Sequence, residues 1–368
     1  MKAVLLVGGE ATRLRPLTCN TTKAMVPLIN VPFLEYVIRY LAVHGIDHII
    51  LTQRSLSTPL ADYFGDGRRL GVRLIYTIEE TPLDTAGAVK NAARDIDDTF
   101  VVMNGDVFTN LDITALVAFH KEKQSKTTIA LTPVENPTIY GLIETDAVGS
   151  ITRFLEKPSW SEVTTNMINA GIYVMEPEVL SLIPPNTRYS FERGLFPMLL
   201  AKGSPFCALP SNAYWMDIGT PEKYFRANCD LLEGRCRIEQ SEPPAEGACV
   251  GEGTTIHPST RIEGRVVIGD NCNIEANVRL IGPTVIGANC RIQAGAVIEA
   301  SILWHGVEVG EGAQIRKSVV ANNCGLHSHS IVEECFLGDS VTLATSCKLE
   351  PGSKIWPGTR VDASSSGG

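Results

Sequence analysis

The 368-residue sequence lacks the features of a membrane protein or a nucleic-acid-binding protein. It has no run of about 18 apolar residues, the minimum for a membrane-spanning helix. Met1 and Lys2 lead directly into an apolar segment, without the layout of a signal peptide. The net charge of -9 excludes the basic excess of a general nucleic-acid surface. These absences predict a cytoplasmic protein with no membrane or nucleic-acid partner.

The cysteines lack the spacing of metal or redox sites. Ten cysteines are scattered through the chain without a Cys-x-x-Cys pair, so neither a zinc site nor a thioredoxin-like motif is indicated. We interpret them as reduced thiols. His327 and His329 are the nearest to a metal-ligand spacing, but two histidines are too few for a structural zinc site, and none is predicted.

Length and composition are those of a globular protein with more than one domain. Apolar residues make up 44% of the chain and charged residues 20%, which is ordinary for a soluble protein. At roughly 150 residues per domain, the length predicts two or three domains.

The first part of the chain alternates between helix and strand patterns. Apolar residues between Leu34 and Leu41 recur at i, i+3, i+4 and i+7, which predicts a helix that ends at Gly45. Strands are expected at residues 48–51, 72–78 and 100–103. This alternation predicts an α/β domain with a doubly wound, mainly parallel sheet, in which ligands bind at the carboxyl ends of the strands.

The first strand leads into a loop suited to binding phosphate. Residues 2–7 predict a buried strand because residues 3–7 are all apolar, and Gly8-Gly9 allows the close backbone approach that such a loop needs. Loop amides donate hydrogen bonds to phosphate oxygens, while Arg13 and Lys23 add positive charge that stabilises an anionic leaving group. This segment is therefore a candidate nucleotide site.

The sequence GGEATRLRPLT at residues 8–18 resembles the signature loop of the sugar-phosphate nucleotidyltransferases, also called nucleotide-sugar pyrophosphorylases. Ala11 stands where the family usually has glycine, and Thr22-Lys23-Ala24 replaces its Pro-Lys-Pro segment. The resemblance covers residues 1–232 and implies a Rossmann-like nucleotidyltransferase domain. The two charged members of the loop, Arg13 and Lys23, are kept.

Two aspartates match the metal site of this family. Asp106 follows the strand at 100–103, and Asp217 lies in the sequence WMDIGTP at residues 215–221. Two carboxylates suit Mg²⁺, which prefers hard oxygen ligands and is commonly held by few protein groups plus substrate phosphates. The resemblance therefore implies that Asp106 and Asp217 bind Mg²⁺.

The remaining site residues are also implied by the resemblance. The catalytic residues are Arg13, Lys23, Asp106 and Asp217. The nucleotide-binding residues are Gly8, Gly9, Thr12, Arg13, Glu79, Glu80, Thr85 and Gly87. The residues around the sugar phosphate are Gly141, Glu156, Lys157 and Asn169. Lys157 suits the charge of the attacking phosphate, whereas Glu156 and Asn169 suit sugar hydroxyls.

The expected reaction is Mg²⁺-dependent attack of a sugar 1-phosphate on a nucleoside triphosphate, which gives a nucleotide-sugar and pyrophosphate. The motifs resemble most closely the mannose-1-phosphate guanylyltransferases that carry a β-helix tail. Glucose-1-phosphate uridylyl- and thymidylyltransferases share nearly every motif and remain alternatives. A non-catalytic relative that binds a sugar nucleotide and regulates a partner is another alternative, kept open by Ala11 and by Asp84, which replaces a usual glycine.

The nucleobase is predicted from Glu79 and Glu80. In uridylyl- and thymidylyltransferases the position aligned with Glu79 is commonly glutamine, which both donates and accepts hydrogen bonds. A carboxylate only accepts, so it can take the adjacent N1 and N2 donors of guanine, but it would face the carbonyl oxygens of uracil. This difference favours GTP.

Beyond residue 247 the chain has an internal repeat. Aliphatic residues recur at every sixth position, at Val250, Ile256, Ile262, Ile268, Ile274, Leu280, Ile286, Ile292 and Ile298. A period of six is typical of a parallel β-helix, and it resembles the left-handed hexapeptide-repeat β-helix. The register slips near Trp304 and is expected to resume at Ile331. Four cysteines occupy a small-residue position of the repeat and are interpreted as buried apolar residues: Cys272, Cys290, Cys335 and Cys347.

These patterns give the expected domain organisation. Residues 1–232 form a catalytic domain that closes with a helix over 221–232, and residues 233–247 form a linker. Residues 248–363 form the β-helix, and residues 364–368 form a flexible tail. We expect the β-helix to serve as a scaffold through which the chain forms a homo-oligomer.

Overall fold

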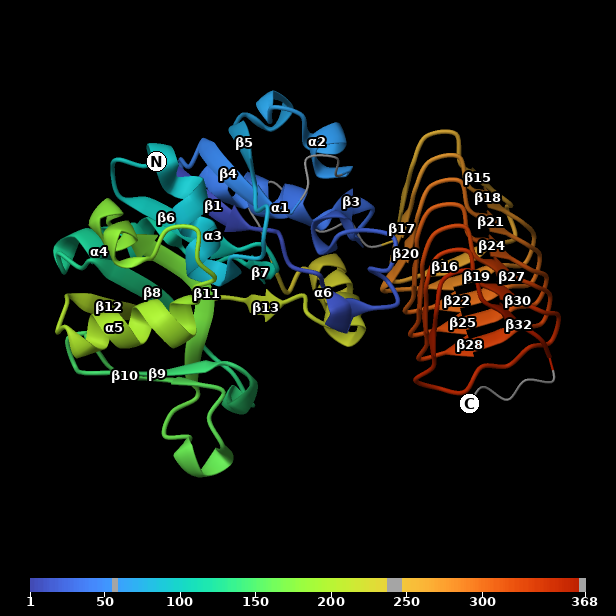
Figure 1. Ribbon diagram of the computed structural model, residues 1–368. Coiled ribbons are helices and arrows are strands. Elements are labelled where there is room, and N and C mark those ends of the chain that lie inside the picture. The colour runs from blue at the N-terminus through green and yellow to red at the C-terminus, as the bar shows by residue number, and fades with distance from the viewer. Residues whose placement is uncertain (55–58, 237–246, 364–368) are drawn as a thin grey trace. The chain divides into compact units, whose positions relative to one another are not determined.

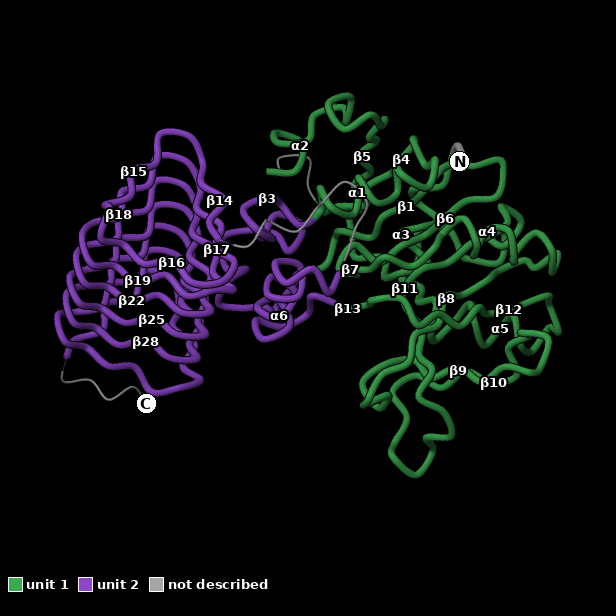
Figure 2. The backbone as a smooth tube through the Cα atoms, turned by 180° about the vertical axis from the view of Figure 1, so that it is seen from behind, with its two compact units in different colours: residues 1–9, 34–216 green, residues 10–33, 217–368 purple. Residues whose placement is uncertain are grey.

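A computed structural model describes residues 1–54, 59–236 and 247–363. Contacts divide the chain into two compact units, which are coloured in Figure 2. The first unit contains residues 1–9 and 34–216, and the second contains residues 10–33 and 217–368. Each unit is therefore discontinuous in sequence. Most of the predicted linker and the whole predicted tail lie outside the described residues.

The first unit contains a nine-stranded mixed sheet with the order β10-β9-β11-β6-β1-β4-β5 (Figure 1). Off this path, β8 pairs with β11, and β12 pairs with β8. Its parallel half consists of β1 (Lys2–Leu6), β4 (His48–Gln53), β5 (Arg73–Ile78) and β6 (Phe100–Asn104). These are the strands predicted from apolar runs. Residues at the centre of β1 and β6 are buried on both sheet faces, as expected for parallel strands covered by helices.

The other half of this sheet is largely antiparallel. It consists of β8 (Thr127–Pro133), β9 (Gly141–Thr145), β10 (Ile151–Glu156), β11 (Met167–Met175) and β12 (Phe206–Pro210). Strand β11 pairs antiparallel with β6, β8 and β9 and so joins the two halves. Two short strands, β7 (Val107–Thr109) and β13 (Trp215–Asp217), form a separate pair. The predicted Rossmann-like fold is confirmed, although the sheet is mixed.

The helices of this part of the chain are α1 (Phe33–Val43), α2 (Pro59–Phe64), α3 (Asp84–Ala92), α4 (Ile113–Glu122) and α5 (Phe196–Ala201). Helix α1 confirms the helix predicted from the spacing of its apolar residues. Val4, Ile50 and Val102 belong to one buried cluster with Val89 of α3 and Phe196 of α5. No helix among the described residues has the length and apolar content needed to cross a membrane.

The second unit contains a left-handed parallel β-helix whose strands form three sheets. The first face contains β14 (Gly247–Val250), β17 (Arg265–Ile268), β20 (Thr284–Ile286), β23 (Ile302–Leu303), β26 (Val319–Val320), β29 (Phe336–Leu337) and β31 (Lys354–Ile355). The second face contains β15 (Thr255–Ile256), β18 (Asn273–Ile274), β21 (Arg291–Ile292), β24 (Glu308–Val309), β27 (Gly325–Leu326), β30 (Thr342–Leu343) and β32 (Arg360–Val361). The third face contains β16 (Arg261–Glu263), β19 (Arg279–Ile281), β22 (Val297–Glu299), β25 (Gln314–Arg316) and β28 (Ile331–Glu333).

The six-residue repeat continues through the region where its register was expected to be lost. Paired strands of the first face are 18 positions apart at Val267 and Val285, but 17 positions apart at Val285 and Ile302. The next coils are also shortened, so the inward positions become Leu303, Val309, Ile315, Val320, Leu326 and Val332. Val332, not the predicted Ile331, therefore faces the core. One residue is omitted at the same corner of each short coil.

Small polar residues complete this corner. The hydroxyl of Thr284 accepts the amide of Ser301 at 3.3 Å, and the hydroxyl of Ser301 accepts the amide of Ser318 at 3.2 Å. Ser318 in turn accepts the amide of Cys335 at 3.0 Å. Cys335 is fully buried here, and Cys272, Cys290 and Cys347 are also buried, which confirms their interpretation as buried small residues.

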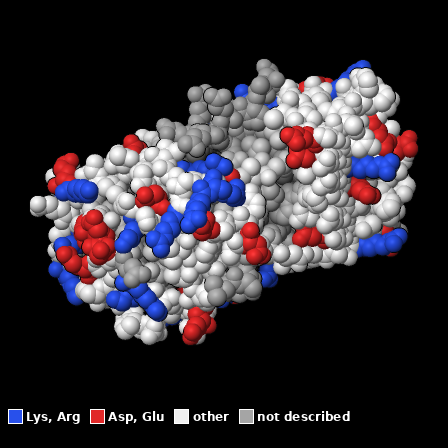
Figure 3. Space-filling view, turned by 90° about the horizontal axis from the view of Figure 1, so that it is seen from above, with Lys and Arg blue, Asp and Glu red and all other residues white. Residues whose placement is uncertain are grey.

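The three faces differ in their outer surfaces. On the second and third faces, charged residues pair between coils, as in Arg291 with Glu275 at 3.1 Å and Arg316 with Glu299 at 3.4 Å. Figure 3 shows basic and acidic side chains next to one another on the β-helix. In the middle coils of the first face the outward side chains are apolar and buried, as Val285, Ile302 and Val319 are. Exposed ion pairs on the other two faces add little stability. Buried apolar side chains on the outside of the first face indicate that another segment packs against it.

The first face is covered by two segments that the sequence placed in the catalytic domain. One is α6 (Pro221–Leu232), whose start is capped by the Thr220 side chain as predicted. The other is residues 10–33, here called the N-terminal loop, which contains short 3₁₀ helices at Thr12–Leu14 and Lys23–Met25 and the hairpin of β2 (Pro27–Leu28) and β3 (Val31–Pro32). Both segments belong to the second unit (Figure 2).

Candidate active site

Glycines lie where the parallel strands of the first unit end. A Cβ atom on Gly8 would lie 3.2 Å from Oε1 of Glu79, and one on Gly105 would lie 2.5 Å from the side chain of Val7. Gly105 therefore leaves no room for a Cβ atom, whereas a Cβ atom on Gly8 would require the Glu79 side chain to shift. A Cβ atom on Gly9 would meet nothing within 4 Å, so no packing contact requires that glycine. The close approach between Gly8 and Glu79 joins the ends of β1 and β5 at one site.

Glu79 is the carboxylate of this strand edge. Its side chain is buried, and Oε2 accepts the amide of Leu83 at 3.1 Å. Burial raises the pKa of the Glu79 carboxyl, although the hydrogen bond from Leu83 opposes this shift. One oxygen is thus engaged with the loop before α3, and the other is directed toward Gly8. Glu80, by contrast, is exposed.

Thr85 and Gly87 hold the start of α3 against residues 187–192. The Thr85 hydroxyl accepts the amide of Phe191 at 2.8 Å and donates to Glu192 at 3.3 Å. A Cβ atom on Gly87 would lie 2.5 Å from the carbonyl of Thr187. Asp84 has a φ of 62°, which explains the usual glycine at this position.

The residues expected around the sugar phosphate lie on β9, β10 and β11. Gly141 is paired with Glu156, and a Cβ atom on Gly141 would lie 3.2 Å from Oε2 of Glu156. Lys157 follows directly, with its amide donated to the carbonyl of Tyr140 at 2.9 Å. Asn169 donates to the hydroxyl of Tyr173 at 2.9 Å, and its Oδ1 accepts the amide of Gly171 at 2.9 Å.

Glu192 is a residue that the sequence did not identify. Burial raises the pKa of Glu156, and the nearby negative charge of Glu192 raises it further. Ser190 donates to Glu192 at 2.6 Å. Two carboxylates therefore lie close together in an acceptor-rich part of the site, which suits sugar hydroxyls. No spacing in the sequence connects Glu192 with Glu156, because they come from separate elements.

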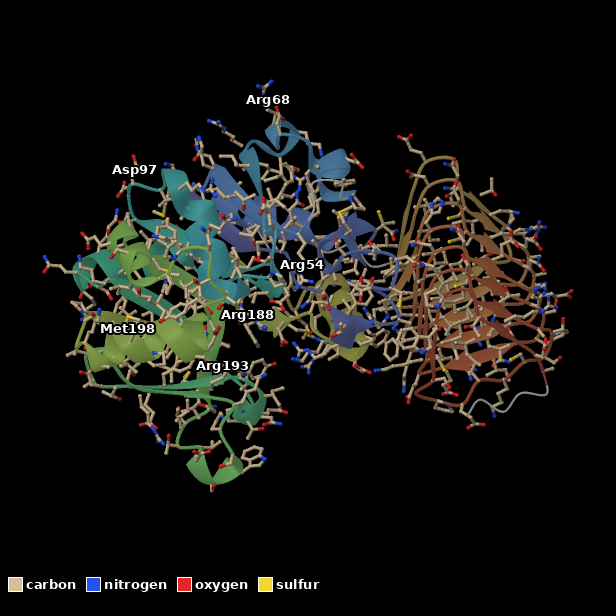
Figure 4. The ribbon with its side chains drawn as sticks, in the orientation of Figure 1. Arg54, Arg68, Asp97, Arg188, Arg193 and Met198 are labelled. Carbon is tan, nitrogen blue, oxygen red and sulfur yellow. The ribbon has the colours of Figure 1, made fainter. Side chains whose placement is uncertain are left out.

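Asp106 follows β6 in the same unit. Asn104, at the end of β6, lies against Gly171 of β11, where a Cβ atom would be 2.6 Å from the Asn104 side chain. Trp215 donates its indole NH to the carbonyl of Ala170 at 2.8 Å. These contacts connect the strand end before Asp106 with the sugar-phosphate residues. Further cations of the first unit are Arg54, Arg188 and Arg193, labelled in Figure 4.

The other predicted catalytic residues belong to the second unit. Arg13 and Asp217 flank Gly219, where a Cβ atom would lie 3.4 Å from Nη2 of Arg13 and 3.0 Å from Oδ2 of Asp217. Oδ1 of Asp217 forms an ion pair with Lys223, in the first turn of α6. Lys23 starts the second 3₁₀ helix of the N-terminal loop. Lys223 is a site residue that the sequence did not reveal, since the pair spans the turn before α6.

The donor chemistry of Asp106 and Asp217 fits a hard divalent cation. Asp217 is largely buried with its carboxylate between cationic groups, and Asp106 is partly buried. The described residues contain no group of three or more His, Cys, Asp or Glu side chains that could hold a metal by themselves. A metal held by one or two carboxylates and completed by substrate phosphates is consistent with that finding. The His327 and His329 pair is part of no such group in the described chain.

Comparison with known proteins identifies the family. Residues 2–234 match the family model described as nucleotidyl transferase, and residues 250–349 match the EIF2B subunit epsilon LbH domain. The chain therefore belongs to the nucleotidyl transferase family, as its motifs predicted. Members of this family generally use a divalent metal ion.

Three relatives illustrate the match. A mannose-1-phosphate guanylyltransferase from Mycobacterium tuberculosis is 38% identical over 285 residues, which cover 72% of this chain and 79% of the relative. A UTP--glucose-1-phosphate uridylyltransferase from Synechocystis is 35% identical, with 87% of each chain covered. The crystal structure of HddC from Yersinia pseudotuberculosis is 29% identical with a TM-score of 0.54, and covers 62% of this chain and 97% of that chain.

Proposed function

We propose that this chain is a mannose-1-phosphate guanylyltransferase that uses Mg²⁺. A phosphate oxygen of mannose 1-phosphate forms a bond to the α-phosphorus of GTP, and the bond from that phosphorus to the bridging oxygen of the β-phosphate breaks. The products are GDP-mannose and pyrophosphate. Support comes from the family, from the guanylyltransferase of Mycobacterium tuberculosis among the relatives, and from the carboxylate at the strand edge.

The observation that carries the choice of GTP is Glu79 beside Gly8. An acceptor-only side chain at the end of β5 suits the paired donors of guanine and repels the carbonyl oxygens of uracil. Because Oε2 already accepts the amide of Leu83, Oε1 is the oxygen available to the base. One carboxylate oxygen is enough to favour guanine, which presents NH donors, over uracil, which presents carbonyl oxygens.

The predicted residues have complementary roles in this reaction. Arg13 and Lys23 stabilise the departing pyrophosphate, and Lys157 holds the incoming phosphate. Asp106 and Asp217 would hold Mg²⁺, which supplies charge neutralisation at the triphosphate when it is bound. The acceptors Glu156 and Asn169 orient the sugar hydroxyls. No side-chain nucleophile is required, because positioning and charge neutralisation supply most of such catalysis.

The test is release of pyrophosphate from GTP and mannose 1-phosphate in the presence of Mg²⁺, with UTP and glucose 1-phosphate as the alternative pair. We choose this alternative pair because one relative is the UTP--glucose-1-phosphate uridylyltransferase from Synechocystis. Release with GTP supports the proposal, whereas preference for UTP contradicts it. A non-catalytic sensor would bind the sugar nucleotide without releasing pyrophosphate from any pair.

Glu79→Gln tests the base assignment separately. The variant keeps an oxygen that can accept the amide of Leu83 but loses the negative charge. Loss of a hydrogen bond to a charged group is worth about 1.5–3 kcal/mol, so kcat/KM for GTP should fall by about tenfold or more relative to UTP. Glu80→Gln is the matched control, and an equal effect of both changes would contradict the role of Glu79. Cytoplasmic location and homo-oligomerisation through the β-helix remain predictions.

A further inference from the structure

The N-terminal loop is anchored to the β-helix on both sides of Lys23. Asn20 donates to Oδ2 of Asp339 at 3.0 Å, and Asn30 donates to the carbonyl of Ile286 at 2.8 Å. These two partners belong to different coils. The loop therefore runs across several coils of the first face, and Lys23 lies between its anchors.

A buried hydrogen-bond chain joins the β-helix to the loop between these anchors. Trp304, next to β23, donates its indole NH to the hydroxyl of Tyr224 at 2.9 Å, with the rings edge to face at 6.1 Å. The Tyr224 hydroxyl donates to the carbonyl of Pro27. Trp304 and Tyr224 are 2% and 0% exposed. The direction is forced, because an indole NH only donates and a carbonyl only accepts.

Helix α6 reinforces the same contact. Asn228, which is fully buried, accepts the amide of Ile29 at 3.0 Å and donates to the carbonyl of Tyr224 at 3.0 Å. Burial raises the pKa of Tyr224 above its ordinary value, so its hydroxyl stays protonated and can donate to the Pro27 carbonyl. The backbone of the loop is thus held at Pro27 and at Ile29, four and six residues after Lys23.

These buried hydrogen bonds fix the position of the loop more narrowly than apolar packing would. Two phenylalanines could fill much the same volume without any directional requirement, whereas buried polar groups are costly unless each finds its partner. The hydrogen bonds therefore define one position of the Pro27 carbonyl relative to α6 and to the β-helix coil that contains Trp304. Lys23 is four residues away, at the start of a 3₁₀ helix that leads directly into this segment.

We propose that Trp304 of the β-helix is a positioning residue for nucleotidyl transfer, acting through Tyr224 and Pro27 on the loop that carries Lys23. This inference rests on the proposed function. It gives the β-helix a part in the reaction itself, in addition to any role in assembly.

Trp304→Phe tests this role because it keeps a buried aromatic ring and removes the indole NH donor. We expect kcat to fall at least tenfold, while KM for mannose 1-phosphate changes less than twofold. Trp356→Phe is the matched control, since Trp356 lies on the same β-helix and is 54% exposed; its kcat should stay unchanged. A kcat within twofold of the native value in Trp304→Phe would overturn the proposal, even if its melting temperature fell.

A double-mutant cycle shows whether the effect passes through the loop. In a Lys23→Ala background, Trp304→Phe should lower kcat by less than twofold further, because the group being positioned is already absent. A full tenfold loss in that background would contradict action through Lys23.

Amide hydrogen exchange at residues 20–30 provides a readout that does not depend on activity. Trp304→Phe should speed exchange in this segment at least fivefold and leave the amides of β1 unchanged. Unchanged exchange at residues 20–30 would overturn the positioning role. If the native protein released no pyrophosphate from any substrate pair, the proposed function would fail while this measurement still decided the structural link.

Discussion

Glu156, which we propose as a sugar-binding carboxylate, also has a cost to folding. Burial first, and Glu192 second, raise the pKa of its carboxyl. The folded protein therefore binds the proton more tightly than the unfolded chain, and this group lowers stability as pH rises through the ordinary Glu range and up to the raised pKa. The cost is absent at acid pH, where the carboxyl is protonated in both states.

Glu156→Gln should separate the two effects. The variant should unfold at higher urea concentration than the native protein at about pH 8, and the difference should vanish near pH 4, where the native carboxyl is protonated too. At the same time KM for mannose 1-phosphate should rise about tenfold through loss of a charged hydrogen bond. Equal stability of both proteins at about pH 8 would contradict the burial cost.

The Asp217 carboxylate, which we propose as a Mg²⁺ ligand, is paired with Lys223, so the two cations would compete for it. The pair is partly exposed, with side-chain exposure of 31% and 12%, so we expect it to be worth no more than about 1 kcal/mol. Lys223→Met should therefore lower the Mg²⁺ dissociation constant by about two- to fivefold on that scale, as measured by calorimetry without substrate. Lys354→Met, which removes the pair with Glu222 in the same unit, is the control. Weaker Mg²⁺ binding in Lys223→Met would refute the competition.

At the scale of elements, the N-terminal loop contains a strained residue at a departure from the family pattern. Ala11 has a φ of 47°, a left-handed conformation that costs an L-residue about 1–2 kcal/mol. Ala11→Gly relieves this strain but increases the entropy of the unfolded chain, which costs about 0.4–1 kcal/mol. The free energy of unfolding should thus rise by about 0.5–1 kcal/mol in urea titration.

A matched change elsewhere should have the opposite sign. Ala118 is exposed in the middle of α4, where glycine is destabilising by roughly 0.5–1 kcal/mol. A loss of stability in Ala11→Gly similar to that in Ala118→Gly would mean that the left-handed position is not strained.

Most elements could be predicted because their patterns are local. The strand at 100–103, the helix after Pro32 and the six-residue repeat all depend on neighbouring residues. The shortened coils could not be predicted. In the sequence, a coil that is one residue shorter shifts the aliphatic positions in the same way as an interruption of the repeat. The burial of the first face did leave a signal: its strands contain adjacent apolar residues, as in Val285-Ile286, while the second face alternates polar and apolar, as in Arg291-Ile292.

The candidate site was predictable to the extent that motifs mark strand ends. Gly8 and Glu79 follow strands β1 and β5, as their positions after apolar runs suggested. Glu192 and Lys223 were missed, because their neighbours in the site come from distant segments or across a turn. Which oxygen of Glu79 is already engaged could not be read from sequence either, since that depends on the path of the loop to Leu83.

On the scale of the whole molecule, the β-helix is joined to the N-terminal loop. The contacts place residues 10–33 with residues 217–368, although the sequence separates them by most of the α/β domain. A chain that ends at Glu233 would expose the apolar surfaces of α6 and the N-terminal loop that pack in the second unit.

Removal of residues 234–368 should therefore abolish activity as well as assembly. Light scattering and pyrophosphate release together distinguish this expectation from that of a pure scaffold. A truncated monomer with native activity per chain would contradict the role of the β-helix in the reaction, and an unchanged subunit count would contradict its role in assembly.

The most direct test of the central claim is a competition for one active site. The native protein is supplied with mannose 1-phosphate, Mg²⁺ and equal concentrations of GTP, UTP, ATP and dTTP, and the nucleotide-sugars formed are identified by mass. A preference worth about 1.5 kcal/mol or more predicts at least about ten times more GDP-mannose than any other product. A mixture dominated by a uridine or thymidine product, or no product at all, would contradict the account.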